Sequence, residues 1–269
     1  MTDSKIWDKV WNDPGNQEEW NYLSQVILDE LEALLRREGL SNQGGLKMAE
    51  VGCGSGRIST RLARGFPCSL SVLVDHSPVA VTRLKAAVEA GVGTGEVVRG
   101  DLFAIPVKDN SLDLVWNAGV LEHFTGHTQD RAVSEMLRVL KPGGFFISLN
   151  PFAGSILHTL GKAFVESVTT YPYGEEIPIK SLQKSAGAAG QRLHGKEFST
   201  GFIVLFVGMF KRLMIVPGLS FFKIFYTASD RFFCSLYKYG MLPKYMRAAD
   251  LALARLFGGY LLATIIKKQ

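Results

Sequence analysis

The chain has 269 residues, 47% of them hydrophobic and 20% charged, with a formal net charge of +5. This length and composition allow one sizeable buried core and exclude a disordered protein. Cys53, Cys68 and Cys234 are too few and too scattered for a disulfide framework, and no Cys/His spacing suggests a metal site. The polar amino terminus lacks the apolar stretch of a signal peptide, so we expect a cytoplasmic location.

Charge and aromatic residues are unevenly divided along the chain. Residues 1–150 carry 15 Lys and Arg against 19 Asp and Glu, whereas residues 151–269 carry 15 against 6. The second part also holds 19 Phe and Tyr residues. A basic, aromatic half is typical of proteins that meet a nucleic acid, a membrane surface or an acidic substrate. It is equally typical of basic residues that only solvate the outside of an aromatic core.

The predicted elements alternate along the first part of the chain. Apolar residues at three- and four-residue spacing predict a helix over Glu18–Arg37. Five short apolar strands then alternate with helices of about ten residues, which favours βαβ units and a parallel sheet buried on both faces. Right-handed crossovers gather the carboxyl ends of these strands at one edge. The strands are predicted over residues 46–52, 69–75, 96–101, 111–119 and 143–150.

The pattern loosens after residue 150. We predict a loop over 171–179, a helix over 181–190, a strand over 191–199, mostly helical structure over 204–256 and a last strand over 258–268. The longest apolar stretch, residues 201–210, is stopped by Lys211 and Arg212, and the next one contains Pro217. A membrane-spanning helix needs about 20 apolar residues without charges. This segment is therefore expected to be buried or to lie in a membrane interface.

A glycine-rich segment, EVGCGSG over residues 50–56, lies between a predicted strand and a predicted helix. Glycine lets a backbone turn tightly and approach a ligand closely. A dinucleotide-binding loop has GxGxxG spacing, whereas this loop has GxGxG and Arg57 stands where the third glycine would fall. Glu50 places a carboxylate at the strand end, which repels a pyrophosphate and attracts a cationic ligand.

The sequence AEVGCGSGRIST resembles motif I of the class I S-adenosylmethionine-dependent methyltransferases, and later landmarks of this family follow in order. The resemblance covers about residues 46–150, and the final GGYLLATIIKK resembles the family's closing antiparallel strand. It implies a Rossmann-like, doubly wound α/β fold with seven strands, mostly parallel, and here a helical insertion. It also implies S-adenosyl-L-methionine as the cofactor.

The resemblance gives the glycine loop and the second strand roles in binding that cofactor. Gly52, Gly54 and Gly56, with Cys53 among them, resemble the loop under the amino acid part of the cofactor, and Glu50 lies near its charged methionine end. Asp75, followed by His76, ends the second strand and resembles the acid that accepts both ribose hydroxyls. As a structural alternative, Asp75 caps the next helix.

The third and fourth strands carry the remaining landmarks. Asp101 and Leu102 resemble the pair that meets the adenine, although Asp101 could also cap a turn. Asn117 and Ala118 resemble the segment that faces the sulfonium. His123 follows near the cofactor edge and is a candidate general base; alternatively, it and its neighbour Glu122 serve packing and the helix dipole.

We expect a single domain. Residues 1–45 would form a helical cap, 46–150 the cofactor-binding core, and 151–269 the substrate-side elements, with a helical insertion over about 204–256 and the last strand over about 259–268. Candidates for lining the acceptor pocket, or for simple packing, are Trp7, Trp11, Trp20, Tyr22, Tyr171, Tyr173, Glu175 and Glu176.

The insertion is interpreted in three ways: it roofs an apolar pocket, which we favour, it rests on a membrane, or it forms an extra packed layer. In the first case the rings of Phe221, Phe222, Phe225, Tyr226, Phe232 and Phe233 should line one cavity. In the second they should form an exposed patch rimmed by Lys211, Arg212 and Lys223.

The sequence thus favours methyl transfer to a small, hydrophobic or lipid-like acceptor, with nucleic acid disfavoured and peripheral membrane contact left open. Two other functions compete: an NAD-dependent oxidoreductase, and a non-catalytic membrane-associated binding protein with the same fold.

Overall fold

The computed structural model describes residues 4–13, 20–40, 45–66, 68–169, 174–189, 193–238 and 242–269. Within these residues one seven-stranded sheet has the order β3-β2-β1-β4-β5-β7-β6. Strands β1 to β5 are parallel, and β7 runs antiparallel to both β5 and β6. This topology confirms the predicted fold. The strands are β1 (Leu46–Val51), β2 (Cys68–Asp75), β3 (Glu96–Arg99), β4 (Leu112–Ala118), β5 (Leu140–Pro151), β6 (Leu193–Thr200) and β7 (Leu261–Lys268).

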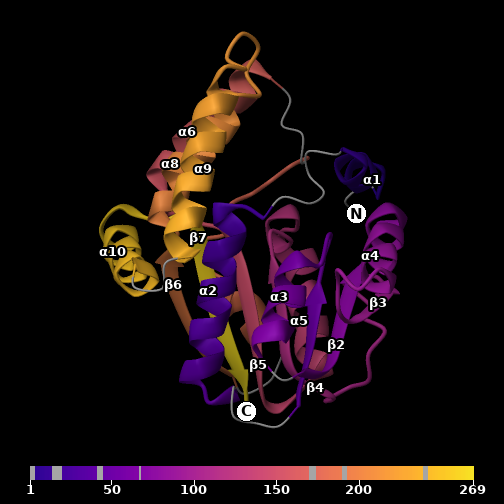
Figure 1. Ribbon diagram of the computed structural model, residues 1–269. Coiled ribbons are helices and arrows are strands. Elements are labelled where there is room, and N and C mark those ends of the chain that lie inside the picture. The colour runs from indigo at the N-terminus through magenta and orange to yellow at the C-terminus, as the bar shows by residue number, and fades with distance from the viewer. Residues whose placement is uncertain are drawn as a thin grey trace.

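Helices cover both faces of the sheet (Figure 1). Successive strand residues point to opposite faces, so Met48 packs with α2 (Tyr22–Arg37) and α3 (Arg57–Gly65), whereas Ala49 packs with α5 (Gly126–Val139) and α7 (Gln183–Ala188). Helix α4 (Pro78–Glu89) joins β2 to β3. Burial on both faces explains why the central strands are mostly apolar.

The amino-terminal region holds one helix that the sequence pattern did not predict, α1 (Ser4–Asn12). Helix α1 lies against α4, where the Ser77 hydroxyl donates a 2.5 Å hydrogen bond to Asp8 and Arg83 donates to the carbonyl of Trp11. Helix α2 begins at Tyr22, four residues later than predicted, because the side chain of Asn21 caps it by accepting from the Ser24 amide.

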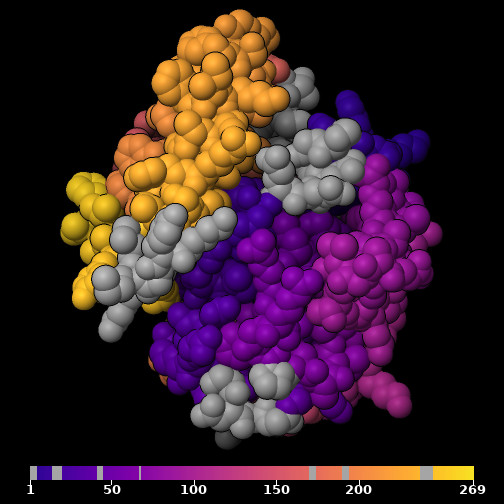
Figure 2. Space-filling model, viewed as in Figure 1, coloured from indigo at the N-terminus to yellow at the C-terminus, as the bar shows by residue number. Residues whose placement is uncertain are grey.

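The described residues between β6 and β7 form three helices: α8 (Phe202–Leu213), α9 (Phe222–Lys238) and α10 (Leu242–Phe257). A further helix after β5, α6 (Ile156–Val168), was not predicted. Figure 1 shows α6, α8 and α9 side by side, extending beyond the carboxyl edge of the sheet, and Figure 2 shows the projection that α8 and α9 form. We call α6, α8 and α9 the helical arm. No helix among the described residues is long and apolar enough to span a membrane.

A buried carboxylate ties the insertion to the body of the protein. Glu30 of α2 is 1% exposed and accepts hydrogen bonds from Thr200 Oγ1 at the end of β6 and from Arg247 Nη2 of α10. Asp250 of α10 accepts from the amides of Gly201 and Ile203, which start α8. Because buried carboxylates require such partners, these bonds fix where α8 leaves the sheet.

Candidate active site

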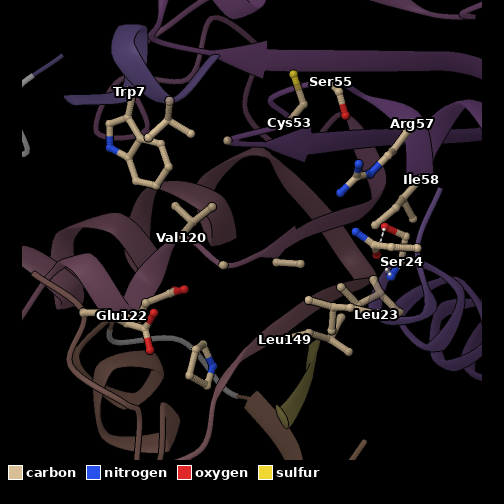
Figure 3. A pocket seen from close by; sticks show the side chains of 18 of the residues that line it. Trp7, Leu23, Ser24, Cys53, Ser55, Arg57, Ile58, Val120, Glu122 and Leu149 are labelled. Atoms are coloured by element: carbon tan, nitrogen blue, oxygen red, sulfur yellow. Dashed lines mark hydrogen bonds between the residues drawn. The ribbon is translucent and has the colours of Figure 1, made fainter. Parts of the chain in front are cut away.

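A cavity of about 1530 Å³ lies at the carboxyl edge of the sheet. It runs from the glycine loop after β1, beneath α1, to the inner side of α8 and α9. Figure 3 shows Trp7, Val120 and Glu122 on one side of it and Arg57, Ile58 and Leu149 on the other. Ligands of doubly wound α/β proteins bind at this edge, so the cavity is the candidate active site.

The glycine loop needs glycine for backbone conformation at three positions. Gly52, Gly54 and Gly56 have φ of 73°, 51° and 60°, in the left-handed region that favours glycine. Only Gly52 of the three lines the cavity. A Cβ at Gly54 would lie 2.2 Å from the Trp11 ring, and one at Gly56 would lie 2.8 Å from Leu84. Close packing against α1 and α4, as well as space for a ligand, therefore excludes side chains here.

Asp75 lines the cavity at the end of β2 and is held by the backbone around it. It is 6% exposed, and its oxygens accept from the amides of Gly54 at 2.8 Å and Ser77 at 2.9 Å. Ser77, not Asp75, is the N-cap of α4, so the helix-capping alternative for Asp75 is wrong. His76 also lines the cavity, with Nδ1 3.7 Å from Asp75 Oδ1.

Asp101 and Leu102 line the cavity after β3. Oδ1 of Asp101 accepts a 2.9 Å hydrogen bond from the amide of Phe103, so this carboxylate also caps a turn, as the structural alternative proposed. The two interpretations are compatible, because a carboxylate has further lone pairs for a ligand donor.

Glu50 is a buried carboxyl group at the end of β1, beside the glycine loop. It lines the cavity, it is 6% exposed, and its Oε2 has no hydrogen-bond partner. Burial raises the pKa of Glu50 to about 8, although hydrogen bonds from Ser59 and the charge of Arg57 oppose this shift. A buried carboxyl oxygen without a partner is costly for the protein, and a cationic ligand would satisfy it.

The end of β4 contributes backbone and a small side chain to the cavity. Ala118 lines it, but Asn117 does not. The Asn117 side chain is fully buried, accepts a 2.8 Å hydrogen bond from Ser148 Oγ and places Nδ2 3.2 Å from the sulfur of Met136. It therefore points toward α5, because successive residues of a strand alternate between faces.

The segment after β4 places an imidazole and a carboxyl group at the cavity. His123 Nδ1 lies 2.7 Å from the Glu175 carbonyl oxygen. A carbonyl only accepts, so Nδ1 carries the proton and Nε2 keeps its lone pair. Burial lowers the pKa of His123 and raises that of Glu122 well above its usual value. Both groups are therefore expected to be uncharged at neutral pH.

The predicted aromatic lining of the acceptor pocket is present in part. Trp7 and Trp11 of α1 line the cavity, and Trp7 makes an edge contact with the His123 ring at 5.0 Å between centroids. Trp20 and Tyr22 do not line it: Trp20 stacks on the Arg61 guanidinium and Tyr22 packs on Phe233. Of the other candidates, Glu175 supplies the carbonyl that binds His123 and Glu176 lines the cavity. Tyr171 and Tyr173 lie outside the described residues.

The expectation that the insertion's phenylalanines line the pocket is wrong. Of the six named rings only Tyr226 lines the cavity, whereas Phe221, Phe225 and Phe232 are 52%, 52% and 57% exposed. Arg212, which the membrane interpretation placed at the rim of a surface patch, is 9% exposed and lines the cavity. The apolar part of the lining comes instead from residues that include Val204 and Val207 of α8. Their three-residue spacing in a predicted helix was the sequence signal that could have identified them.

The fold and the cavity define a doubly wound α/β domain with a candidate ligand site at the carboxyl edge of its sheet. Residues 49–148 match a family described as "Methyltransferase domain". The chain is 32% identical over 127 residues to a malonyl-[acyl-carrier protein] O-methyltransferase of Methylococcus capsulatus, covering 44% of this chain and 45% of that protein. It is 27% identical to a ubiquinone/menaquinone biosynthesis C-methyltransferase of Geobacter sulfurreducens, covering 62% of this chain and 75% of that protein.

A solved structure agrees on the fold along nearly the whole chain. The structure of a putative sarcosine dimethylglycine methyltransferase from Galdieria sulphuraria superposes with a TM-score of 0.58 at 16% identity, covering 98% of this chain and 97% of that one. The match of residues 49–148 to the methyltransferase-domain family agrees with the motif resemblance to the class I S-adenosylmethionine-dependent methyltransferases, and the solved structure agrees on the fold. The match to the first relative spans less than half of that protein's length.

Proposed function

We propose that the protein transfers a methyl group from S-adenosyl-L-methionine to a small, apolar acceptor in this cavity. The observation that carries the proposal is the arrangement of Glu50, an unsatisfied buried carboxyl group, beside the left-handed glycine loop and the fixed carboxylate of Asp75. This set suits a ligand with a cationic end and neighbouring hydroxyl donors.

Each end of the cofactor has matching residues in the cavity. Glu50, with the backbone of Gly52 and Cys53, would hold the charged methionine part; Asp75 and His76 the ribose; Asp101 and Leu102 the adenine. When bound, the cofactor supplies a methyl group already activated on a sulfonium, so the protein mainly has to align the acceptor and exclude water. Trp7 and Trp11 of α1 are placed to provide that exclusion.

His123 is the residue we propose as general base where the acceptor must lose a proton. Its Nε2 is unprotonated because Nδ1 donates to the Glu175 carbonyl, and its lowered pKa keeps it so at neutral pH. The edge contact with Trp7 and the bond to Glu175 hold the ring in place.

An apolar acceptor is favoured by the lining of the cavity beyond the cofactor-binding residues. Val204, Val207 and Ile215 lie there with Tyr226 and Tyr260. Charged residues line the same part, namely Lys211, Arg212, Lys223, Asp230 and Arg231, so its lining is partly apolar and partly charged. Apolar side chains with polar groups that fix the orientation are typical of sites for hydrophobic small molecules. The relatives named for quinone and malonyl-acyl carrier methylation agree with a small or lipid-like acceptor.

Binding measurements on the purified protein test the cofactor assignment. Calorimetry should show tight binding of S-adenosylmethionine and S-adenosylhomocysteine and weak or undetectable binding of NAD. Tight NAD binding without S-adenosylmethionine binding would favour the oxidoreductase alternative.

Asp75→Ala should weaken S-adenosylmethionine binding by about 10-fold or more. Two charge-assisted hydrogen bonds, each contributing about 1.5 kcal/mol or more, would be lost, and the Gly54 amide would lose its acceptor. Glu89→Ala, at an exposed carboxylate of the adjacent helix α4, is the matched control and should bind normally. Unchanged affinity in a folded Asp75→Ala protein would remove Asp75 from the site.

We also propose that the helical arm contacts a membrane surface, from which a lipid-like acceptor would enter. Ile224 and Leu160 are 72% and 63% exposed, and Phe164, Phe225 and Phe232 about half exposed. Monomeric soluble proteins rarely expose so many large apolar side chains on neighbouring helices. The excess of 15 basic over 6 acidic residues after residue 150 suits an anionic lipid surface.

Vesicle sedimentation tests this contact. The protein should bind vesicles containing anionic lipid more strongly than neutral vesicles, and Ile224→Glu with Phe225→Glu should abolish binding, because charge opposes insertion of the arm. Val92→Glu changes a 67% exposed apolar residue away from the arm and should have no effect. Equal vesicle binding by the double variant and by Val92→Glu, or no vesicle binding by the wild type, would contradict the proposal.

A further inference from the structure

Arg212 stands at the last turn of α8, with its side chain inside the cavity instead of in solvent. It lines the cavity together with Val204, Val207 and Ile215, and it is 9% exposed. Its guanidinium lies 5.6 Å from the ring centroid of Tyr260. An arginine is almost never buried without a paired acceptor, so its surroundings need an explanation.

The hydrogen bonds of Arg212 leave much of its guanidinium unused. Nη2 lies 2.6 Å from His158 Nδ1. Because a guanidinium only donates, His158 Nδ1 accepts, and the imidazole proton is on Nε2, which faces Glu176 Oε1 at 3.3 Å. Among the described residues, neither Nε nor Nη1 of Arg212 has a hydrogen-bond partner.

The charge of Arg212 is also without a direct counterion. Among the described residues no carboxylate lies within 4.0 Å of its guanidinium, and its one partner, His158, is a fully buried imidazole. The nearest carboxyl group in this network, Glu176, lies on the far side of that imidazole. His158 and Glu176 therefore orient Arg212 without neutralising it at close range.

We propose that Arg212 binds a carboxylate of the methyl acceptor, so that the acceptor is an apolar molecule with an anionic end. This inference rests on the proposed function and names its substrate class. A guanidinium matches the two oxygens of a carboxylate in geometry and charge. The apolar side chains of α8 would take the hydrophobic part. Of the cations that line this half of the cavity, Arg212 is buried, whereas Lys211 is partly exposed and Lys223 and Arg231 are exposed.

Decanoate and decan-1-ol are suitable probes, because they share an apolar chain and differ in the anionic end. Binding is measured by calorimetry at pH 8, below the micelle concentration, on protein saturated with S-adenosylhomocysteine. The wild type should bind decanoate at least about 10-fold more tightly than decan-1-ol. Arg212→Met should weaken decanoate binding by at least about 10-fold and leave decan-1-ol binding within about 2-fold.

Two controls keep the test decisive. Arg255→Met removes an exposed arginine of α10 outside the cavity and should change neither affinity. Arg212→Lys keeps the charge but not the planar fork, so it should lose only part of the preference for decanoate, and it serves if Arg212→Met does not fold. Unaltered affinity of Arg212→Met for S-adenosylhomocysteine shows that the cofactor half is intact.

The outcomes test the role of Arg212 separately from the proposed function. Equal wild-type affinities for decanoate and decan-1-ol, or decanoate binding that persists in Arg212→Met or does not weaken in Arg212→Lys, would overturn the role of Arg212. A wild type that does not bind S-adenosylhomocysteine would instead contradict the proposed function.

Discussion

Glu50→Gln is expected to weaken S-adenosylmethionine binding by roughly 30- to 150-fold. The substitution keeps the shape of the side chain but removes the negative charge that Glu50 acquires when a cationic ligand displaces its proton. A hydrogen bond to a charged group contributes about 2–3 kcal/mol in a buried site. Calorimetry checks this affinity. Glu96→Gln, at an exposed glutamate that starts β3, is the matched control and should bind like the wild type.

The same substitution should stabilise the cofactor-free protein at pH 8. The pKa of Glu50 is about 8 in the folded protein against 4.5 for the free side chain, so the folded state binds this proton more tightly than the unfolded chain does. The stability that the protonated group contributes is complete below about pH 4.5 and is lost as the pH rises to about 8. Since each pKa unit corresponds to about 1.4 kcal/mol, removing the ionisable group should raise the free energy of unfolding at pH 8 by more than about 2 kcal/mol.

Denaturant unfolding at pH 5 and pH 8 measures this effect. The wild type should lose more stability than Glu50→Gln between the two pH values, and Glu96→Gln should follow the wild type. Identical pH dependence in all three proteins would mean that Glu50 is not a buried, desolvated acid. Binding of a cationic ligand should also release a proton near neutral pH in the wild type and not in Glu50→Gln.

Gly54→Val is expected to abolish cofactor binding while most of the fold remains. The position has φ of 51°, and an added Cβ would meet the Trp11 ring at 2.2 Å, so the loop and α1 cannot both keep their positions. The amide of Gly54 would also move away from Asp75 Oδ2, its 2.8 Å partner. Because this loop lies outside the sheet core, thermal unfolding should remain cooperative.

Gly161→Val is the control for this substitution. Gly161 lies in α6 with open space around its Cβ position, so the variant should bind the cofactor like the wild type. Circular dichroism and calorimetry compare the two variants. Normal binding by Gly54→Val would show that the glycine loop does not touch the cofactor and would remove the central element of the site.

The sequence alone determined the core of the fold and identified most of the residues that line one end of the cavity. Strands buried on both faces are recognisable as short apolar runs, and the parallel sheet that these runs predict is observed for β1 to β5. The antiparallel last strand was implied by the family resemblance and is observed as β7. The glycines of the loop follow from local backbone conformation, and Asp75 and Asp101 follow from their positions at strand ends. These signals are local, because each depends on residues that are neighbours in the chain.

Only the tertiary structure decided which side chains face the cavity. Asn117 points toward α5 because of the register of β4, and Phe225 lies outside although it belongs to the same aromatic segment as Tyr226. Arg212 is held inside by His158, 54 positions earlier, and α1 reaches Gly54 through Trp11. Contacts between residues so far apart depend on how the helices pack on the sheet, and hydrophobic periodicity along the chain carries no information about that packing.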